Sequence, residues 1–176
     1  RGQSLTVMAP PGVAASRVIM IGLGDADLID ELAAQSFGGQ AWKSVASTGD
    51  KSALVAVDPI SGSKLNVADL AANAAFGAVL GSYRFDKYRT QEKSSSKPSI
   101  TTLAICSRDA AGAKKAYAPM AKIASGVFLT RDLVSEPANV IYPITLAQQA
   151  RTLSKLGVKV SVLEEKQLAK LHLGAL

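Results

Sequence analysis

Two proline-containing dipeptides, Glu136-Pro137 and Tyr142-Pro143, divide the sequence. Proline disfavours the α conformation for the residue before it, so each dipeptide predicts a helix boundary. A long helical pattern precedes the first dipeptide, and a second helical pattern follows the other. The sequence therefore predicts a domain junction with a short extended connector between two helices. We place an N-terminal α/β domain at residues 1–134 and the beginning of a second domain at residues 135–176.

Strand and helix patterns alternate before the junction. Apolar runs predict strands at Ser4–Met8, Arg17–Leu23, Ser52–Val57 and Ile100–Cys106. Helical spacing predicts helices at Asp25–Val45, Asp69–Leu80 and Ala110–Val134. The polar, basic stretch Tyr83–Ser99 predicts a loop. This alternation indicates a mixed, mostly parallel sheet flanked by helices on both faces.

Apolar spacing also predicts which side of each helix is buried. The first helix has an expected inner face of Leu28, Ile29, Leu32 and Ala33, and Gly38-Gly39 interrupts its pattern. The alanine-rich second helix is expected to pack closely against a neighbour. The third helix has this expected stripe: Ala113, Ala116, Tyr117, Met120, Ile123, Ala124, Val127 and Phe128.

The segment after the junction predicts the opening of a second α/β unit. Thr145 and Gln148 have the spacing of a capping box, and Gly157 is placed to end that helix. Val158, Val160 and Val162 alternate as in a strand, and Glu164–Leu171 predicts a short helix. One strand and two helices do not enclose a core, so we expect this unit to be incomplete.

Composition limits the class of protein. A chain of 176 residues with 48% hydrophobic content can bury one core, and it has no apolar run of about 18 residues that predicts a membrane span. Its start shows no signal-peptide pattern and no initiator Met, so we expect a piece of a longer protein. The single cysteine, Cys106, cannot form an internal disulfide, which is typical of a reducing compartment.

The formal charge of +6 suits an acidic partner such as nucleic acid, but the basic residues are spread over most of the chain. A solvated basic surface is the interpretation we favour.

Four stretches carry a resemblance to a known family. They are Thr130–Val140 (TRDLVSEPANV), Ala9–Gly12 with Arg17–Gly24, Gly81–Thr90 (GSYRFDKYRT) and Leu171–Leu176 (LHLGAL). In this order they resemble the N-terminal domain, and the start of the catalytic domain, of the cytosolic leucine aminopeptidases. Ser135 stands where many members carry Asn.

The resemblance implies a macro-domain-like first domain followed by the start of an α/β catalytic domain. It further implies a cytoplasmic homohexamer that removes N-terminal, leucine-like residues from peptides. Members of the family are two-metal hydrolases that use manganese or zinc, and their metal ligands lie downstream of residue 176. We therefore expect residues 1–176 alone to bind no metal pair and to be inactive. The alternative is a non-catalytic α/β module that binds a nucleotide or DNA.

Two motifs are similar to known binding motifs. Gly22-Leu23-Gly24 follows a strand and precedes a helix, as in dinucleotide-binding turns, but Asp27 occupies the place of the third glycine and its charge repels phosphate. A structural turn is therefore favoured. The segment Tyr83–Arg89 interleaves aromatic and basic side chains, as in proteins that bind single-stranded nucleic acid. The resemblance assigns this segment to packing and subunit contact, with DNA binding as the second interpretation.

The remaining polar residues do not form a recognisable catalytic set. His172 is the only histidine in the sequence. A histidine-rich metal site or a catalytic triad needs partner residues that the sequence does not offer. The acidic residues come in small groups that suit helix ends: Asp25 and Asp27, Asp30-Glu31, and Glu164-Glu165. We assign no catalytic, cofactor-binding or metal-binding residue to this chain.

Overall fold

The computed structural model describes residues 2–174, which form two compact units that divide between Leu129 and Thr130. Ala175 and Leu176, the end of the predicted LHLGAL stretch, lie outside the described residues. The sequence-based boundary between Val134 and Ser135 stays a prediction. Within the described part, no helix is both long and apolar enough to cross a membrane.

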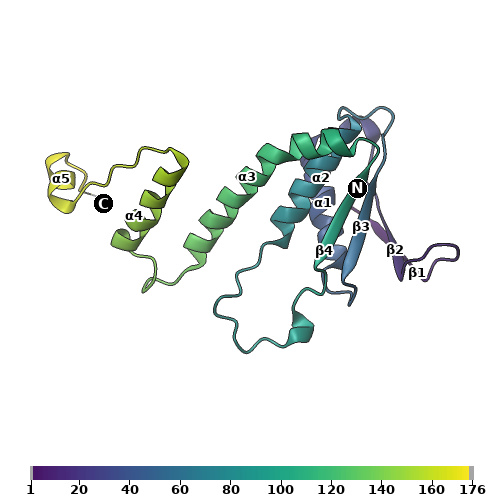
Figure 1. Cartoon of the computed structure of the whole chain (residues 1–176), viewed down its shortest axis with the longest axis horizontal. Coiled ribbons are helices and arrows are strands. Elements are labelled where there is room, and N and C mark those ends of the chain that lie inside the picture. The colour runs from purple at the N-terminus through teal and green to yellow at the C-terminus, as the bar shows by residue number, and fades with distance from the viewer. Residues whose placement is uncertain (1, 175–176) are drawn as a thin grey trace. The chain divides into compact units, whose positions relative to one another are not determined.

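Across residues 2–174, the two units contain four strands and five α-helices (Figure 1). The strands are β1 (Ser4–Met8), β2 (Arg17–Ile21), β3 (Ser52–Val57) and β4 (Thr102–Ser107). The helices are α1 (Glu31–Val45), α2 (Val67–Ser82), α3 (Ala110–Ser135), α4 (Pro143–Thr152) and α5 (Glu165–Lys170), with 3-10 helices η1 (Ala26–Leu28), η2 (Ser94–Ser96) and η3 (Leu153–Leu156). The predicted mixture of helices and strands is confirmed.

The strands form two separate sheets. β1 pairs with β2 antiparallel, with Ser4 opposite Ile21, and β3 pairs with β4 parallel, with Ser52 opposite Thr102. Within the described residues β2 does not pair with β3, so the predicted single, mostly parallel sheet is not found. The structure contains one antiparallel hairpin and one parallel pair.

The core of the first unit lies where α1 and α2 pack together and against β3. Its buried side chains include Ile29, Leu70 and Val57. Gly38 and Gly77 bring the two helices into backbone contact: a Cβ on Gly38 would lie 1.8 Å from the Ala74 carbonyl oxygen. The small residues of α2 therefore allow the close packing that the sequence predicted. Gly38 and Gly39 do not interrupt α1, which continues to Val45.

A buried amide strengthens the same helix pair. The Asn73 side chain is 2% exposed and accepts a hydrogen bond of 2.8 Å from the Gln35 side chain of α1. Its own amide group donates to the Asp69 carbonyl at 3.0 Å. Because both ends of this buried amide have partners, it adds specificity to the α1–α2 register without an unsatisfied polar group.

Two of the predicted helix faces need correction. On the first helix Ile29 and Ala33 are each 2% exposed, but Leu28 and Leu32 are 60% and 68% exposed. Leu28 lies in the separate turn η1, before α1 begins at Glu31, so it does not continue the helical phase of α1. Leu32 lies in the first turn of α1, on its solvent-exposed side. The stripe on α3 is at least partly buried at every predicted position except Ile123, which is 58% exposed.

The β3–β4 pair is covered on one face. Val57 points into the core, whereas Leu54 on the opposite face is 66% exposed. Alternate residues of β4 follow the same pattern, with Ile105 against the core and Cys106 exposed. The expectation of helices on both faces is therefore not met by these two strands in the described part of the chain.

The second unit contains helices and turns. After Pro137, the amide groups of Val140 and Ile141 both donate to the Pro137 carbonyl, at 2.9 and 3.0 Å, so the connector is a tight turn rather than the predicted extended segment. The N-cap of α4 is Tyr142, whose N–H donates to the Thr145 hydroxyl at 2.9 Å. The predicted capping box at Thr145 and Gln148 is therefore wrong, because the helix starts one turn earlier.

The predicted strand at Val158, Val160 and Val162 is also absent. No other strand lies in the described part of this unit, so an alternating sequence there has no ladder partner. Gly157 does end the preceding helical segment, with a positive φ of 84°. None of the three helices that lie wholly in this unit has a fully buried residue, so its described part has no core of its own.

The helix contact gives a stability prediction. A Cβ on Gly77 would lie 1.9 Å from the Gln35 carbonyl oxygen, so Gly77→Ala must push α1 and α2 apart. We expect a loss of about 1–3 kcal/mol in the free energy of unfolding, measured by thermal or urea denaturation. Gly126→Ala on α3 is the matched control, because nothing lies within 4 Å of its Cβ and alanine favours a helix. Equal stability of the two variants would contradict close packing.

Candidate functional site

The first unit contains an open groove of about 1080 Å³ between the two sheets. β2 forms one wall and β3 forms the other. Helix α1 contributes Phe37, Ala41 and Val45 to its floor. Most of its lining is apolar, so the groove suits an apolar or extended occupant better than a phosphate group.

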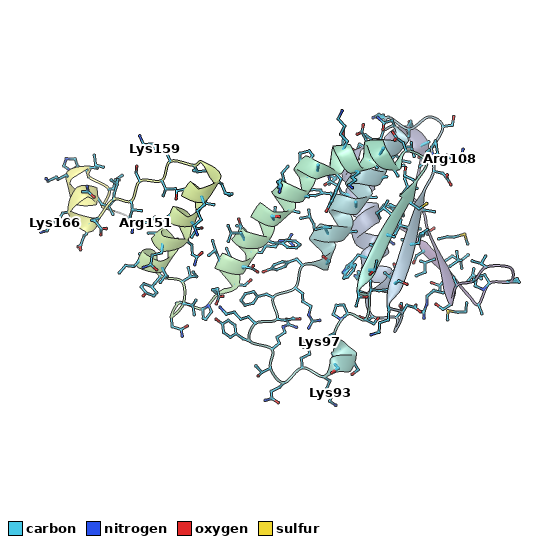
Figure 2. The ribbon with its side chains drawn as sticks, viewed as in Figure 1. Lys93, Lys97, Arg108, Arg151, Lys159 and Lys166 are labelled. Atoms are coloured by element: carbon cyan, nitrogen blue, oxygen red, sulfur yellow. The ribbon has the colours of Figure 1, made fainter. Side chains whose placement is uncertain are left out.

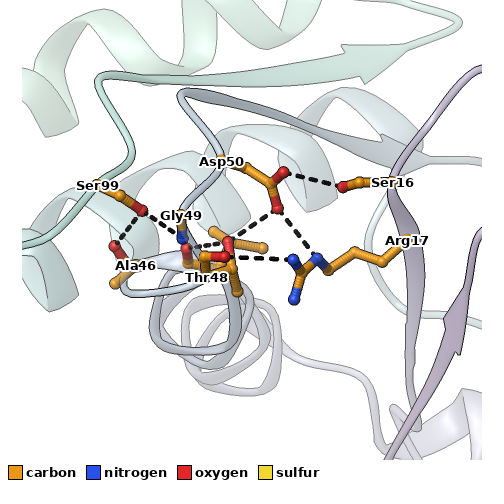
Figure 3. Close-up of polar contacts among 8 residues, drawn as sticks. Ser16, Arg17, Ala46, Thr48, Gly49, Asp50 and Ser99 are labelled. Carbon is orange, nitrogen blue, oxygen red and sulfur yellow. Dashed lines mark hydrogen bonds and ion pairs between the residues drawn. The ribbon is translucent and has the colours of Figure 1, made fainter.

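A polar network ties the two walls together at the amino ends of their strands (Figure 3). The Arg17 guanidinium, at the start of β2, lies 3.0 Å from the Asp50 carboxylate and donates to the Thr48 carbonyl at 3.2 Å. The hydroxyl groups of Ser16 and Thr48 each donate to Asp50 at 2.9 Å. Sequence patterns missed this pairing, because Arg17 and Asp50 are far apart in the chain and neither stands in a motif.

The network changes the acidity of Asp50. The hydrogen bonds from Ser16 and then Thr48, with the nearby positive charge of Arg17, hold the pKa of the Asp50 carboxyl below its ordinary value of 3.8. A carboxylate held in this way is a structural anchor rather than a general base, because it stays ionised at neutral pH and has its oxygens occupied.

Few of the side chains that line the groove are ionisable. Its ionisable lining residues are Arg17, Asp50 and Lys51, and the first two are paired with each other. Over residues 2–174, no three His, Cys, Asp or Glu side chains come together in a way that could hold a metal ion. The described residues therefore do not fit a two-metal centre.

The glycine turn after β2 does not form a phosphate site. Gly22 donates its N–H to the Gln3 carbonyl at 2.9 Å, so that donor is already used in the β1–β2 hairpin. Gly24 has a positive φ of 88° and leads into η1 rather than into α1. The N-terminus of α1 is capped by Asp30, which accepts from the Ala33 N–H at 2.7 Å. This geometry supports the structural turn.

The aromatic and basic side chains of Tyr83–Arg89 do not form one exposed platform. The Arg84 guanidinium is bound by two carboxylates, Glu92 and Asp86, which raise the pKa of Arg84 above its ordinary value. The Tyr83 ring packs 5.2 Å from the Phe128 ring of α3. Only the later part of the segment is exposed, where the Lys87 ammonium lies 5.4 Å from the centre of the Tyr88 ring. The segment is therefore mainly a packing element.

The other basic residues are dispersed rather than gathered. Lys93 and Lys97 lie together beside η2, whereas Arg108 lies at the opposite end of β4 (Figure 2). Arg108 is itself paired with Asp58 at 3.2 Å. This distribution agrees with a solvated basic surface.

The remaining candidates stand at helix ends. His172 follows α5 with a positive φ of 56°, and Glu164 is the N-cap of that helix. Asp25 precedes η1 in the first unit. Each stands at a helix end, as predicted, and none lines the groove.

Arg84 gives a prediction about the loop. Arg84→Gln should increase amide hydrogen exchange over residues 86–97, because it removes the charge that binds Asp86 and Glu92. Lys93→Gln, at an exposed position in the same loop, should leave exchange unchanged. DNA affinity that falls in the Arg84, Lys87 and Arg89 triple glutamine variant, with unchanged loop exchange, would contradict a packing role.

Asp50 gives a prediction about pH. Because its folded-state pKa is lowered, its contribution to stability is complete above the unfolded pKa and is lost as the pH falls through the folded value. Asp50→Asn should therefore lower the unfolding midpoint at pH 7, and the difference from the parent should shrink below pH 3.8. Asp58→Asn, at an exposed ion pair, is the control and should have little effect at either pH. A difference for Asp50→Asn that grows on acidification would contradict the assignment.

The sequence of this chain is similar to that of known proteins. A sequence model described as the N-terminal domain of the cytosol aminopeptidase family matches residues 1–92. A probable cytosol aminopeptidase of Caulobacter vibrioides is 39% identical over 177 residues, which is 100% of this chain and 34% of that protein. The chain thus spans about a third of the length of the curated relatives it matches.

Two solved structures have a similar fold. The bottromycin maturation enzyme BotP in complex with Mn has a TM-score of 0.74 and 26% identity, covering 97% of this chain and 34% of that one. A variant of tomato leucine aminopeptidase has a TM-score of 0.73 at 24% identity, covering 97% of this chain and 33% of that one, and so shows likeness of fold. With the family match over more than half of its length, this chain belongs to the cytosol aminopeptidase family.

Proposed function

We propose that this chain is the N-terminal domain, with the entry to the catalytic domain, of a metal-dependent aminopeptidase that removes leucine-like residues from the N-termini of peptides. The observation that carries the proposal is the match of residues 1–92 to the N-terminal domain of that family. Similarity to a probable cytosol aminopeptidase over the full chain supports it.

The catalytic centre belongs, in this proposal, to the part of the polypeptide beyond residue 176. Two features of the chain support that division. The described residues hold no cluster of metal-ligating side chains, and the groove holds one ion pair already committed to structure. The complete enzyme takes two divalent ions, manganese or zinc, as the resemblance implies. A neighbouring structure, BotP, is described in complex with Mn, which is consistent with this choice.

The N-terminal unit then has a supporting role. Its rigid α1–α2 pair and its exposed apolar side chains, such as Leu32 and Leu54, suit it to packing against further protein rather than to chemistry. By resemblance, the complete protein is a cytoplasmic homohexamer in which this unit shapes access and assembly. The loop at Tyr83–Arg89 gives little support for DNA binding, because Asp86 and Glu92 already bind the Arg84 guanidinium.

Activity measurements on two forms of the protein test the proposal. Residues 1–176 alone should not hydrolyse a leucyl amide, whereas the polypeptide extended to its natural C-terminus should do so when supplied with manganese or zinc. The physical reason is that a two-metal centre needs ligands that fix both ions, and residues 2–174 lack such a cluster.

The same substrate and metal concentrations should be used for both forms, with a chelator as control. Metal-dependent turnover by residues 1–176 would mean that the short chain contains a site of its own. An extended protein that stays inactive across metals and pH would favour the alternative, a non-catalytic binding module.

A further inference from the structure

The loop Tyr83–Ser99, between α2 and β4, is rich in basic residues and exposed over much of its length. An endopeptidase that cleaves after lysine or arginine can act there only at the bonds that follow these residues. The candidate bonds are Arg84–Phe85, Lys87–Tyr88, Arg89–Thr90, Lys93–Ser94 and Lys97–Pro98. Such an enzyme binds its substrate as an extended strand, so the segment around the bond must leave its other contacts. The contacts of the loop therefore decide which bond is available.

The first half of the loop is held by a charged clamp of Arg84, Asp86, Arg89 and Glu92. The Arg84 guanidinium is bound by the carboxylates of Asp86 and Glu92. The Arg89 N–H donates to the Asp86 carbonyl at 2.9 Å, and its guanidinium lies 4.0 Å from the Glu92 carboxylate. The three candidate bonds before Thr90 lie inside this charged clamp, so cleavage at any of them first requires the clamp to open.

The second half of the loop is less firmly attached. Residues 93–97 are all exposed and include the three serines of η2. Their recorded contacts are a bond of 3.4 Å from the Arg84 guanidinium to the Ser96 carbonyl and the local turns of η2 itself. Firm attachment resumes at Ser99, whose N–H donates to the Ala46 carbonyl at 2.6 Å. An exposed stretch of small polar residues between two anchored points is typical of a site of proteolytic cleavage.

Proline removes one of the two candidate bonds in this second half. Pro98 follows Lys97, and the nitrogen of proline carries no hydrogen and is closed in a ring that restricts the residue before it. A serine endopeptidase has to accommodate that residue and protonate the leaving nitrogen, so it cleaves before proline poorly. Lys93–Ser94 is then the bond that needs the least opening, because only Glu92 of the charged clamp stands next to it.

We propose that the Lys93–Ser94 bond is a processing site for a serine endopeptidase whose specificity pocket presents a carboxylate to the lysine ammonium. Hydrolysis breaks the bond between the Lys93 carbonyl carbon and the Ser94 nitrogen, and the oxygen of a water molecule takes the place of that nitrogen. The products are a carboxylate on Lys93 and an ammonium group on Ser94, which takes up both protons of the water. The proposal is independent of the aminopeptidase activity proposed above.

The first unit stays assembled after this cut, because its strongest contacts cross it. Strand β3 precedes the cut and β4 follows it, and the two pair in parallel over their whole length. Ile105 of β4 packs against the core that α1, α2 and β3 form. The charged clamp lies wholly before the cut. Cleavage therefore frees a short tail, Ser94–Pro98, without separating the two products.

Limited digestion of the full-length polypeptide with trypsin, followed by N-terminal sequencing and mass spectrometry, tests the proposal. Within residues 1–176, the first cut should create an amino terminus at Ser94. The two products should elute together in gel filtration and separate only in denaturant. Lys93→Gln should remove this cut, because it removes the side chain that the pocket binds. Lys97→Gln is the matched control and should be cut at the parental rate, since Pro98 already protects that bond.

Two further variants test why this bond is selected. Arg84→Gln removes the charge that holds the charged clamp, so cuts after Lys87 and Arg89 should appear. Pro98→Ala should add a cut after Lys97, because the leaving nitrogen then carries a hydrogen. Both variants gain a cut at a named bond, which distinguishes them from variants that unfold and are cut throughout.

Three outcomes would overturn the proposal. The first is an initial cut at another bond within residues 1–176 of the folded full-length protein. The second is resistance of the Lys93–Ser94 bond until the protein unfolds. The third is separation of the two products without denaturant, which would contradict the shared core. These measurements need no leucyl substrate, so they do not depend on whether the full-length protein is an aminopeptidase.

Discussion

The close contact between α1 and α2 is the constraint on which the first unit depends. The helices approach so closely at Gly38 and Gly77 that a Cβ there would clash with the other helix. The hydrogen bond between Gln35 and Asn73 fixes the register of the two helices. With the two helices locked, Ile29 of the preceding segment and the β3 strand have a fixed surface to pack against. The helix pair is therefore held together by close backbone packing at small residues rather than by large apolar side chains.

The described strands of the first unit form two separate two-stranded sheets on this helix pair. The helices cover one face of β3 and β4, while β2 and β3 each retain an open edge along the same groove. The Arg17–Asp50 network keeps those edges facing each other. In the described residues the groove between these strands is open, and the chain spans about a third of the length of the relatives it matches.

The sequence predicted local structure well where apolar spacing alone decides it. Ser52–Val57 and the alanine-rich α2 are examples, since each carries its own strand or helix pattern. Predictions were less successful for features that depend on a contact with a distant part of the chain. Val158–Val162 alternates like a strand, but strand formation needs a neighbour that the described chain does not provide. The Arg17–Asp50 contact could not be predicted either, because only the crossover through α1 brings two strand ends together. The family was identifiable because four motifs keep their order.

The most direct test of the account is the mass of the natural polypeptide that contains this sequence, measured on protein isolated from its source with an antibody against the first unit. If the chain is the N-terminal part of a cytosol aminopeptidase, that polypeptide should have about three times the 18.2 kDa of residues 1–176, since the chain covers 34% of its relatives. A natural polypeptide of 18.2 kDa, with no larger precursor, would contradict it.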